Sequence, residues 1–197
     1  MIDPAESSRA DLYRILARLW LAAPNRELLQ SLQQAGDSTP SDGHLAAPWQ
    51  TLLAALRSTT VQAAADEYEA LFQGVGKPEI LPYGSYYLAG ALNERPLVRL
   101  RDDLRELGLT RDPQRGETED HIAFLFEVMR YLIVGDDLAV CNLERQRRLF
   151  RAHLQPWIEQ LCDTVEVHPR AVTWRVVAAL TRSFIQVETQ AFDLLEA

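Results

Sequence analysis

The sequence predicts an all-α fold, and three observations lead to that prediction. Apolar residues recur at helical spacing along most of the chain, and prolines and glycines divide the pattern into separate helices. No strand–helix alternation with a glycine fingerprint is present, which argues against an α/β fold. Apolar residues make up 47% of 197 residues, enough to bury a sizeable core. We therefore expect one all-helical domain over residues 1–197.

The first third of the chain carries three helical patterns. Residues 12–20 place Leu, Ile and Trp at helical spacing, and Pro24 follows the end of that pattern. Residues 36–43 are rich in Gly, Ser, Thr and Pro, and they predict an exposed loop. Apolar spacing resumes over residues 52–61 and again over residues 66–72, so two further helices are expected.

Residues 73–84 predict an unusual loop. Five helix-breaking residues fall within eleven positions, namely Gly74, Gly76, Pro78, Pro82 and Gly84. The same stretch contains four large apolar residues, namely Val75, Ile80, Leu81 and Tyr83. Most loops are polar, so an apolar loop is expected either to pack against the core or to bind a ligand.

The rest of the chain predicts six more helices. They are expected over residues 85–90, 97–107, 118–134, 138–153 and 156–165, and from Pro169 onward. The helix over 118–134 is apolar on most of its circumference, which is typical of a helix at the centre of a bundle. Phe124 and Val128 are therefore expected in the core.

Charge and composition exclude several classes of function. The formal charge of −8 disfavours a nucleic-acid partner, because phosphate backbones are also negative, and favours a basic peptide. Cys141 and Cys162 form no ligand cluster, so no metal thiolate site is expected. The acidic N-terminus lacks a signal-peptide pattern, and charges interrupt every apolar stretch, so we expect a cytoplasmic protein with no stable membrane insertion.

Residues 117–121 form the most informative polar cluster. Glu117, Asp120 and His121 lie at the expected start of the 118–134 helix, where carboxylates suit the positive end of the helix dipole. Three interpretations remain open. The cluster is a capped helix start with a satisfied histidine, a metal site of a helical enzyme, or a site where an acid–imidazole pair binds a basic peptide.

No catalytic motif supports an enzyme. Residues 102–106 read Asp-Asp-Leu-Arg-Glu, but three arginines on the same expected helix favour a salt-bridged surface over a magnesium site. A second Glu-x-x-His pair, a P-loop and a nucleophile elbow are all missing from the sequence. We therefore expect a protein that is not an enzyme and has no cofactor, with the metal-dependent enzyme as the alternative.

Four blocks, taken in order, carry a family resemblance. They are residues 68–72 followed by Gly74, then residues 82–88, 117–121 and 153–157. They resemble the Tyr-x-x-Leu-Phe, Pro-aromatic-x-Ser-x-Tyr-Leu, Glu-Pro-x-Asp-His and His-Leu-x-Pro-Trp blocks of the TorD/DmsD/NarJ redox-enzyme maturation chaperones. Order and spacing agree over about residues 8–190. One block alone is weak, but four in order are specific.

The resemblance implies a function and a set of site residues. Such a chaperone, all-α and of the TorD-like type, binds the twin-arginine leader and the apo-form of a molybdopterin oxidoreductase catalytic subunit. It assists cofactor insertion and prevents premature export. A monomer or a dimer, including a domain-swapped one, is expected. Carried over to this sequence, the leader-binding residues are Asp120, His121, Glu117, Tyr83, Gly84, Ser85, Tyr87 and Leu81.

Two positions depart from the family pattern. Thr118 stands where the signature has proline, which is a mild change because both residues suit a helix start. Tyr83 stands where the loop aromatic is frequently tryptophan, which changes the expected shape of the peptide pocket.

Overall fold

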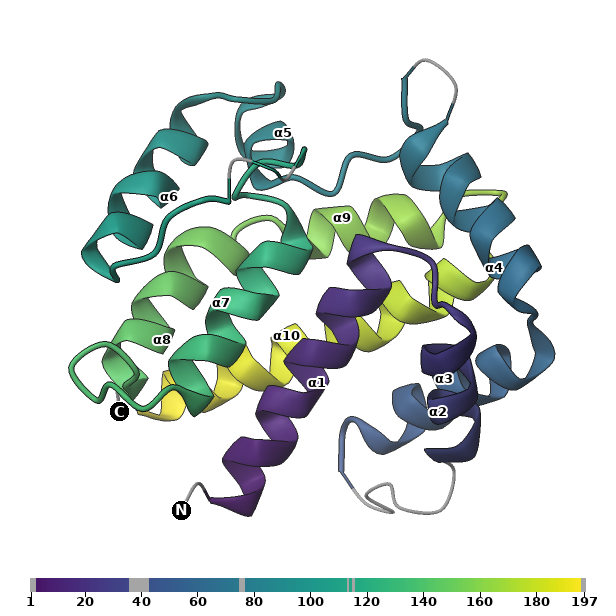
Figure 1. Cartoon of the computed structure of the whole chain (residues 1–197), viewed down its shortest axis with the longest axis horizontal. Helices are drawn as coiled ribbons and strands as arrows, with labels where there is room; N and C mark the ends of the chain where they lie inside the picture. The colour runs from purple at the N-terminus through teal and green to yellow at the C-terminus, as the bar shows by residue number, and fades with distance from the viewer. Residues whose placement is uncertain (1–2, 36–42, 75–76, 113, 115, 196–197) are drawn as a thin grey trace. The chain divides into compact units, whose positions relative to one another are not determined.

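A computed structural model describes residues 3–35, 43–74, 77–112, 114 and 116–195 of the chain (Figure 1). The described residues form helices and no β-strand, which confirms the predicted all-α fold. In chain order the α-helices are α1 (Pro4–Leu21), α2 (Arg26–Gln34), α3 (Ala46–Ser58), α4 (Val61–Tyr68), α5 (Gly84–Ala89), α6 (Arg95–Glu106), α7 (Ile122–Val134), α8 (Leu143–Leu149), α9 (Ile158–Glu166) and α10 (Thr173–Leu194). Short π-helical turns continue α4 over Glu69–Gln73 and α8 over Phe150–Leu154.

Two compact units make up the chain, and each combines two separate stretches of sequence. The first, here called the α7 unit, contains residues 1–21 and 82–158, and the second, the α10 unit, contains residues 22–81 and 159–197. The single domain expected over residues 1–197 stays a prediction.

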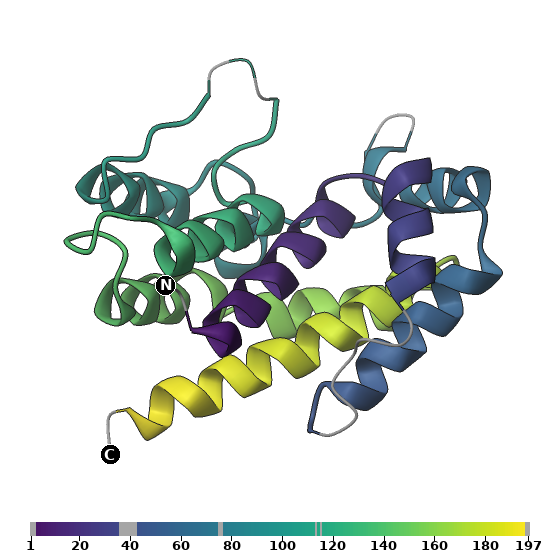
Figure 2. The same ribbon diagram turned by 60° about the horizontal axis from the view of Figure 1, so that its bottom comes forward.

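The core of the α7 unit is the contact between α1 and α7, which lie side by side (Figures 1 and 2). Tyr13 of α1 meets Phe126 of α7 edge to face, with ring centroids 5.5 Å apart, and both side chains are fully buried. Gln146 is also buried, and its amide donates to the carbonyl oxygen of Leu132, which ties α8 to α7.

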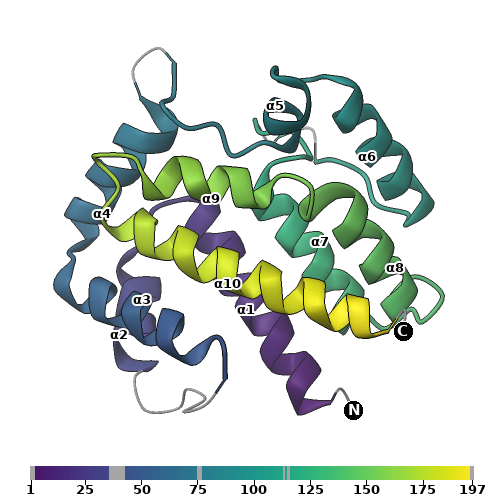
Figure 3. The ribbon, with the colours of Figure 1, turned by 180° about the vertical axis from the view of Figure 1, so that it is seen from behind.

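The core of the α10 unit forms where α10 packs against α3 and α4 (Figure 3). Trp174 is fully buried and contacts the rings of Tyr68 and Phe72, at centroid distances of 5.3 and 6.1 Å. The Glu67 carboxylate accepts from the backbone N–H groups at the start of α10, residues 172–174. It thereby satisfies donors that a helix start leaves without partners.

Several predicted boundaries were wrong. α7 begins at Ile122 rather than residue 118, α8 begins at Leu143 rather than residue 138, and α10 begins at Thr173 rather than Pro169. In the first two cases turn residues precede the helix, and a side chain caps its first turn. The sequence analysis also missed α2, although Asn25 caps it. Most of the expected loop at 36–43, and Val75, lie outside the described residues.

The core prediction for α7 was wrong at two positions. Phe124 and Val128 are only half-buried, whereas Ile122, Phe126 and Met129 are completely buried. A helical wheel shows that both arcs are apolar, so it cannot tell which of the apolar side chains are fully enclosed. Within the described part of the chain, no helix combines the length and apolar character needed to span a bilayer.

Candidate functional site

Two of the predicted site segments are joined to each other in the α7 unit. Residues 82–84 and 120–122 form a short antiparallel bridge centred on Tyr83 and His121. The Gly84 N–H donates to the Asp120 carbonyl oxygen at 2.9 Å, and the Ile122 N–H donates to the Pro82 carbonyl oxygen at 3.0 Å. The bridge therefore fixes the start of α5 against the start of α7.

Asp120 is a buried anchor of this bridge. Its side chain accepts from the Ser85 N–H at 2.8 Å through one oxygen and from the Thr118 hydroxyl at 2.6 Å through the other. The residue is 3% exposed. Because both oxygens have partners and solvent does not reach them, Asp120 positions the bridge and is not available to a ligand arginine.

His121 caps α7 as a neutral acceptor. Its Nδ1 accepts from the Ala123 N–H at 3.2 Å, which requires an unprotonated nitrogen. Burial lowers the pKa of His121 to about 4, although the charges of Glu117 and Asp120 act to raise it. A neutral imidazole at the positive end of a helix removes the difficulty that a cation would create there.

Glu117 and Tyr83 are more accessible than Asp120 and His121. Both are half-buried, and burial, followed by the charges of Glu117 and Asp120, raises the pKa of Tyr83 to about 12. Among the described residues, Glu117 makes no hydrogen bond and no ion pair. Of Glu117, Asp120 and His121, Glu117 is therefore the one that can accept from a ligand.

Three of the remaining predicted residues lie in the α7 unit, and one lies in the α10 unit. A methyl group on Gly84 would lie 3.1 Å from the Trp157 indole nitrogen, so only glycine fits this contact without displacement. Tyr87 stacks on the same indole, with centroids 5.6 Å apart, and the buried Ser85 hydroxyl has no partner in the described structure. Leu81 belongs to the α10 unit rather than to this cluster.

The candidate metal ligands do not converge on one site in the described structure. In the described ranges, no group of three His, Cys, Asp or Glu side chains is placed to hold a metal ion. Asp102 pairs with Arg105 at 2.6 Å, and Asp103 pairs with Arg148 and His153 at 2.6 Å each. This agrees with the expected salt-bridged surface at residues 102–106.

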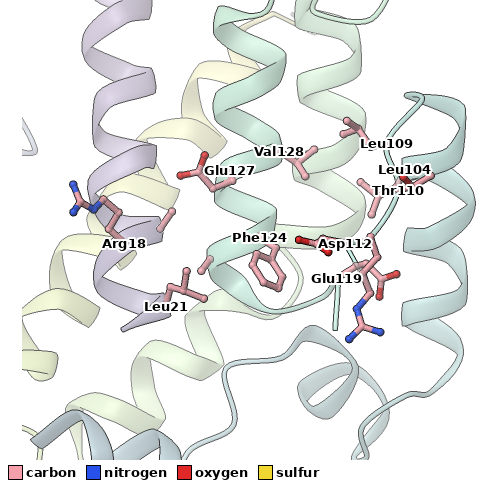
Figure 4. Close-up of a pocket in the computed structure, with 13 residues that line it drawn as sticks. Arg18, Leu21, Leu104, Leu109, Thr110, Asp112, Glu119, Phe124, Glu127 and Val128 are labelled. Atoms are coloured by element: carbon pink, nitrogen blue, oxygen red, sulfur yellow. The ribbon is translucent and has the colours of Figure 1, made fainter. Parts of the chain in front are cut away.

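An apolar groove that the sequence analysis did not anticipate lies in the same unit, with a volume of about 470 Å³ (Figure 4). Its walls come from α1, α7 and the segment that follows α6. The lining residues are Ala17, Arg18, Leu21, Leu104, Leu109, Thr110, Arg111, Asp112, Glu119, Ala123, Phe124, Glu127 and Val128. The two α7 residues wrongly expected in the core, Phe124 and Val128, are thus part of a surface depression.

Comparisons with known proteins place the chain in a family. A family model described as the nitrate reductase delta subunit matches residues 39–163, which is more than half of the chain. The chain belongs to this family. It is the family of TorD and NarJ proteins, so the predicted resemblance is confirmed.

Relatives within the nitrate reductase delta subunit family are named as chaperones. The chain is 29% identical to chaperone protein YcdY of Escherichia coli, over 88% of this chain and 90% of that protein. It is 26% identical to chaperone protein TorD of Shewanella loihica, over 95% and 94% of the two chains. A chaperone role, rather than catalysis, follows from these names.

A solved structure shares the fold. The crystal structure of a putative redox enzyme maturation protein from Archaeoglobus fulgidus matches with a TM-score of 0.55 and 18% identity, and it covers 92% of this chain and 93% of that one. At this identity the likeness shows the all-helical fold alone.

Because His121 is neutral where it caps α7, we expect the free energy of unfolding of this nitrate reductase delta subunit family member to depend on pH. The pKa of His121 falls from 6.5 to about 4 on folding, so between these values the unfolded chain binds a proton that the folded chain does not. The stabilisation is complete above pH 6.5 and is lost as the pH falls toward 4. The free energy of unfolding should therefore decrease by about 2 kcal/mol between pH 6.5 and pH 5.

The matched variant is His121→Asn, which keeps an acceptor at the cap but does not titrate. Urea unfolding of both proteins at pH 7 and pH 5 measures the difference. On acidification from pH 7 to pH 5, the free energy of unfolding should fall by about 2 kcal/mol more in the wild type than in the variant. An equal loss in both proteins would show that His121 is not the titrating group.

Proposed function

We propose that the chain is a cytoplasmic chaperone that binds the twin-arginine leader and the apo-form of a molybdopterin oxidoreductase catalytic subunit. By holding the client, it assists cofactor insertion and prevents premature export. The family and the names of its relatives support the chaperone role. The observation that supports leader binding is the Glu117 carboxylate, which makes no hydrogen bond or ion pair with the described residues and lies near Tyr83 and His121 of the bridge.

The chemistry of Glu117 suits an arginine of the leader. A guanidinium group donates in a fork that matches a carboxylate, and partial burial strengthens such a charge-assisted bond relative to one in water. Tyr83 adds an aromatic ring that is close enough for the charge of Glu117 to raise its pKa after burial has done so. Asp120 and His121 contribute by holding this ring and the segment after Glu117 in place, and Gly84, Ser85 and Tyr87 maintain the packing against Trp157.

The distribution of charge also favours a basic client segment. Residues 22–81 and 159–197 carry thirteen Asp and Glu against six Lys and Arg, whereas residues 1–21 and 82–158 carry fifteen against fourteen. Nearly all of the formal charge of −8 therefore belongs to the α10 unit. The net negative charge of the chain attracts a basic peptide at long range and increases its association rate.

Glu117→Gln tests the proposed contact. The substitution removes the charge with little change in shape, and we expect affinity for a synthetic twin-arginine leader peptide to fall about tenfold at low salt. The loss should become smaller as salt is added, because salt screens the half-exposed wild-type pair. Calorimetric titration at two salt concentrations measures both effects.

The control is Glu94→Gln, which removes one exposed carboxylate from the same unit. The Glu94 side chain does not cap α6, so the substitution changes net charge without removing a contact. Equal weakening by both variants would mean that only net charge matters, and Glu117 would lose its assigned role. A wild-type chain that does not bind the leader would contradict the proposed function itself.

A further inference from the structure

The segment that precedes α7 holds three carboxylates, and they differ in how far a ligand can reach them. Asp120 is buried, and internal donors bind both of its oxygens. Glu117 is half-buried and makes no hydrogen bond or ion pair with the described residues. Glu119 lies between them in sequence, and Arg101 of α6 binds its carboxylate. The third acid therefore has a partner, but that partner is a single side chain from a neighbouring helix.

Arg101 and Glu119 form a fork-to-carboxylate pair. The Nε and Nη2 atoms of Arg101 donate to the two oxygens of Glu119 at 2.9 Å each. A free arginine binds a carboxylate with the same geometry. Burial acts to raise the pKa of Glu119, but the hydrogen bonds from Arg101 hold that pKa below its usual value, so the carboxylate is ionised at neutral pH. Glu119 therefore has the charge and the geometry to bind another guanidinium group in place of Arg101.

Arg101 is the more exposed partner of the pair. Its side chain is 39% exposed, whereas that of Glu119 is 13% exposed. A partly exposed ion pair adds little to stability, because water competes for both of its groups. When Arg101 leaves, its guanidinium group returns to water, and an incoming guanidinium group remakes the two bonds to Glu119. The exchange of one guanidinium group for another therefore has a small net cost.

The spacing of Glu117 and Glu119 suits two arginines that are adjacent in sequence. Two positions of chain span at most about 7 Å between the Cα atoms. Neighbouring Cα atoms of a peptide are about 3.8 Å apart, and arginine side chains are long and flexible. One arginine of such a pair can therefore reach Glu117 while the other reaches Glu119.

We propose that Arg101 sets the affinity of the chain for the leader, because it occupies in the free chain the Glu119 carboxylate that the second leader arginine binds. The inference rests on the proposed function and names the residue that limits binding at the same site. In the free chain, Arg101 pairs a carboxylate that is poorly hydrated. In the complex, the leader arginine replaces it. The second arginine therefore adds less affinity than it would at an unpaired carboxylate, which makes the client easier to release.

Arg101→Gln is the first test variant. It leaves Glu119 without its partner and removes a positive charge that repels the leader. We expect the affinity for a synthetic twin-arginine leader peptide to rise about tenfold at low salt, measured by calorimetric titration of the whole chain. The control is Arg105→Gln on the same helix, which makes the same change in charge and breaks an exposed pair with Asp102. Its affinity should rise much less.

Glu119→Gln, added to Arg101→Gln, separates competition from net charge. The double variant has the net charge of the wild type and lacks the carboxylate that Arg101 occupies. We expect the tenfold gain to disappear, so that the double variant binds the leader about as the wild type does. A gain that persists in the double variant would show that the leader does not use Glu119, and it would overturn the proposal.

Arg101→Lys is the second single variant, and it guards against misfolding. It keeps a cation near Glu119 but cannot form the fork, so the affinity should rise less than in Arg101→Gln. Unfolding midpoints of all variants are compared with that of the wild type before titration. If both substitutions of Arg101 leave the affinity unchanged or lower it, Arg101 only holds the segment in place and the proposal is wrong.

Two further outcomes also decide the matter. If Arg101→Gln and Arg105→Gln raise the affinity equally, net charge explains the gain and Arg101 loses its assigned role. In this case, and in those above, a wild type that binds the leader leaves the proposed function standing. If the wild type does not bind the leader, the proposed function fails and the role of Arg101 fails with it.

Discussion

Phe126→Ala is expected to lower the free energy of unfolding by about 3–5 kcal/mol, which is the usual cost of truncating a fully buried phenylalanine. Phe126 is 0% exposed and meets Tyr13 at the centre of the α1–α7 contact. Because solvent does not reach the ring, truncation leaves a cavity inside the core.

Phe124→Ala is the matched control for this prediction. The same chemical change, two residues earlier on the same helix, should cost only about 1 kcal/mol because the ring is half-buried in an open groove. The two variants are compared by urea unfolding, and the dependence of the unfolding free energy on urea concentration is taken as equal for both. If both variants have the same midpoint, or if Phe124→Ala is the less stable, the orientation of α7 described here is wrong.

Phe124 and Phe126 also show what the sequence can and cannot predict about the fold. Helical periodicity correctly identifies α7 as a helix that is apolar on most sides. The same periodicity cannot tell which apolar arc meets α1, because that depends on contacts across more than one hundred positions of sequence. The predicted starts of α7 and α8 were wrong for a related reason, because the turn residues before each helix also fit a helical pattern.

The leader-binding role of the predicted site residues stays a prediction, and the structure shows how some of these residues are held in place. One of the three interpretations of residues 117–121 was a capped helix start with a satisfied histidine, and His121 does cap α7. The bond from the Ser85 N–H to Asp120 spans 35 positions, so no local pattern reveals that this carboxylate is already occupied. The groove was not predicted because helical periodicity places Phe124 and Val128 on an apolar arc and does not show that both are only half-buried.

The packing of Trp157 explains why separate blocks of the resemblance occur together. The Trp157 indole N–H donates to the His153 carbonyl oxygen at 2.6 Å, its ring stacks on Tyr87, and Gly84 approaches it closely. Residues 82–88 and 153–157 are therefore parts of one contact, although seventy positions separate Tyr87 from Trp157.

The most direct test of the central claim compares two leader peptides. One is the synthetic leader of a molybdopterin oxidoreductase from the same genome, and the other has its apolar run replaced by serines while the arginine pair is kept. Burial contributes about 25 cal/mol per Å² of apolar surface. The loss of only about 110 Å² should therefore cost about 2.7 kcal/mol, or about a hundredfold in affinity.

Calorimetric titration of the whole chain with both peptides gives the result. We expect the native leader to bind in a one-to-one complex and the serine leader to bind at least about a hundredfold more weakly. Added salt should weaken the native complex only in part, because apolar contacts are not screened. Equal affinity for the two peptides, or no binding of the native leader, would contradict the account of this chain as a leader-binding chaperone.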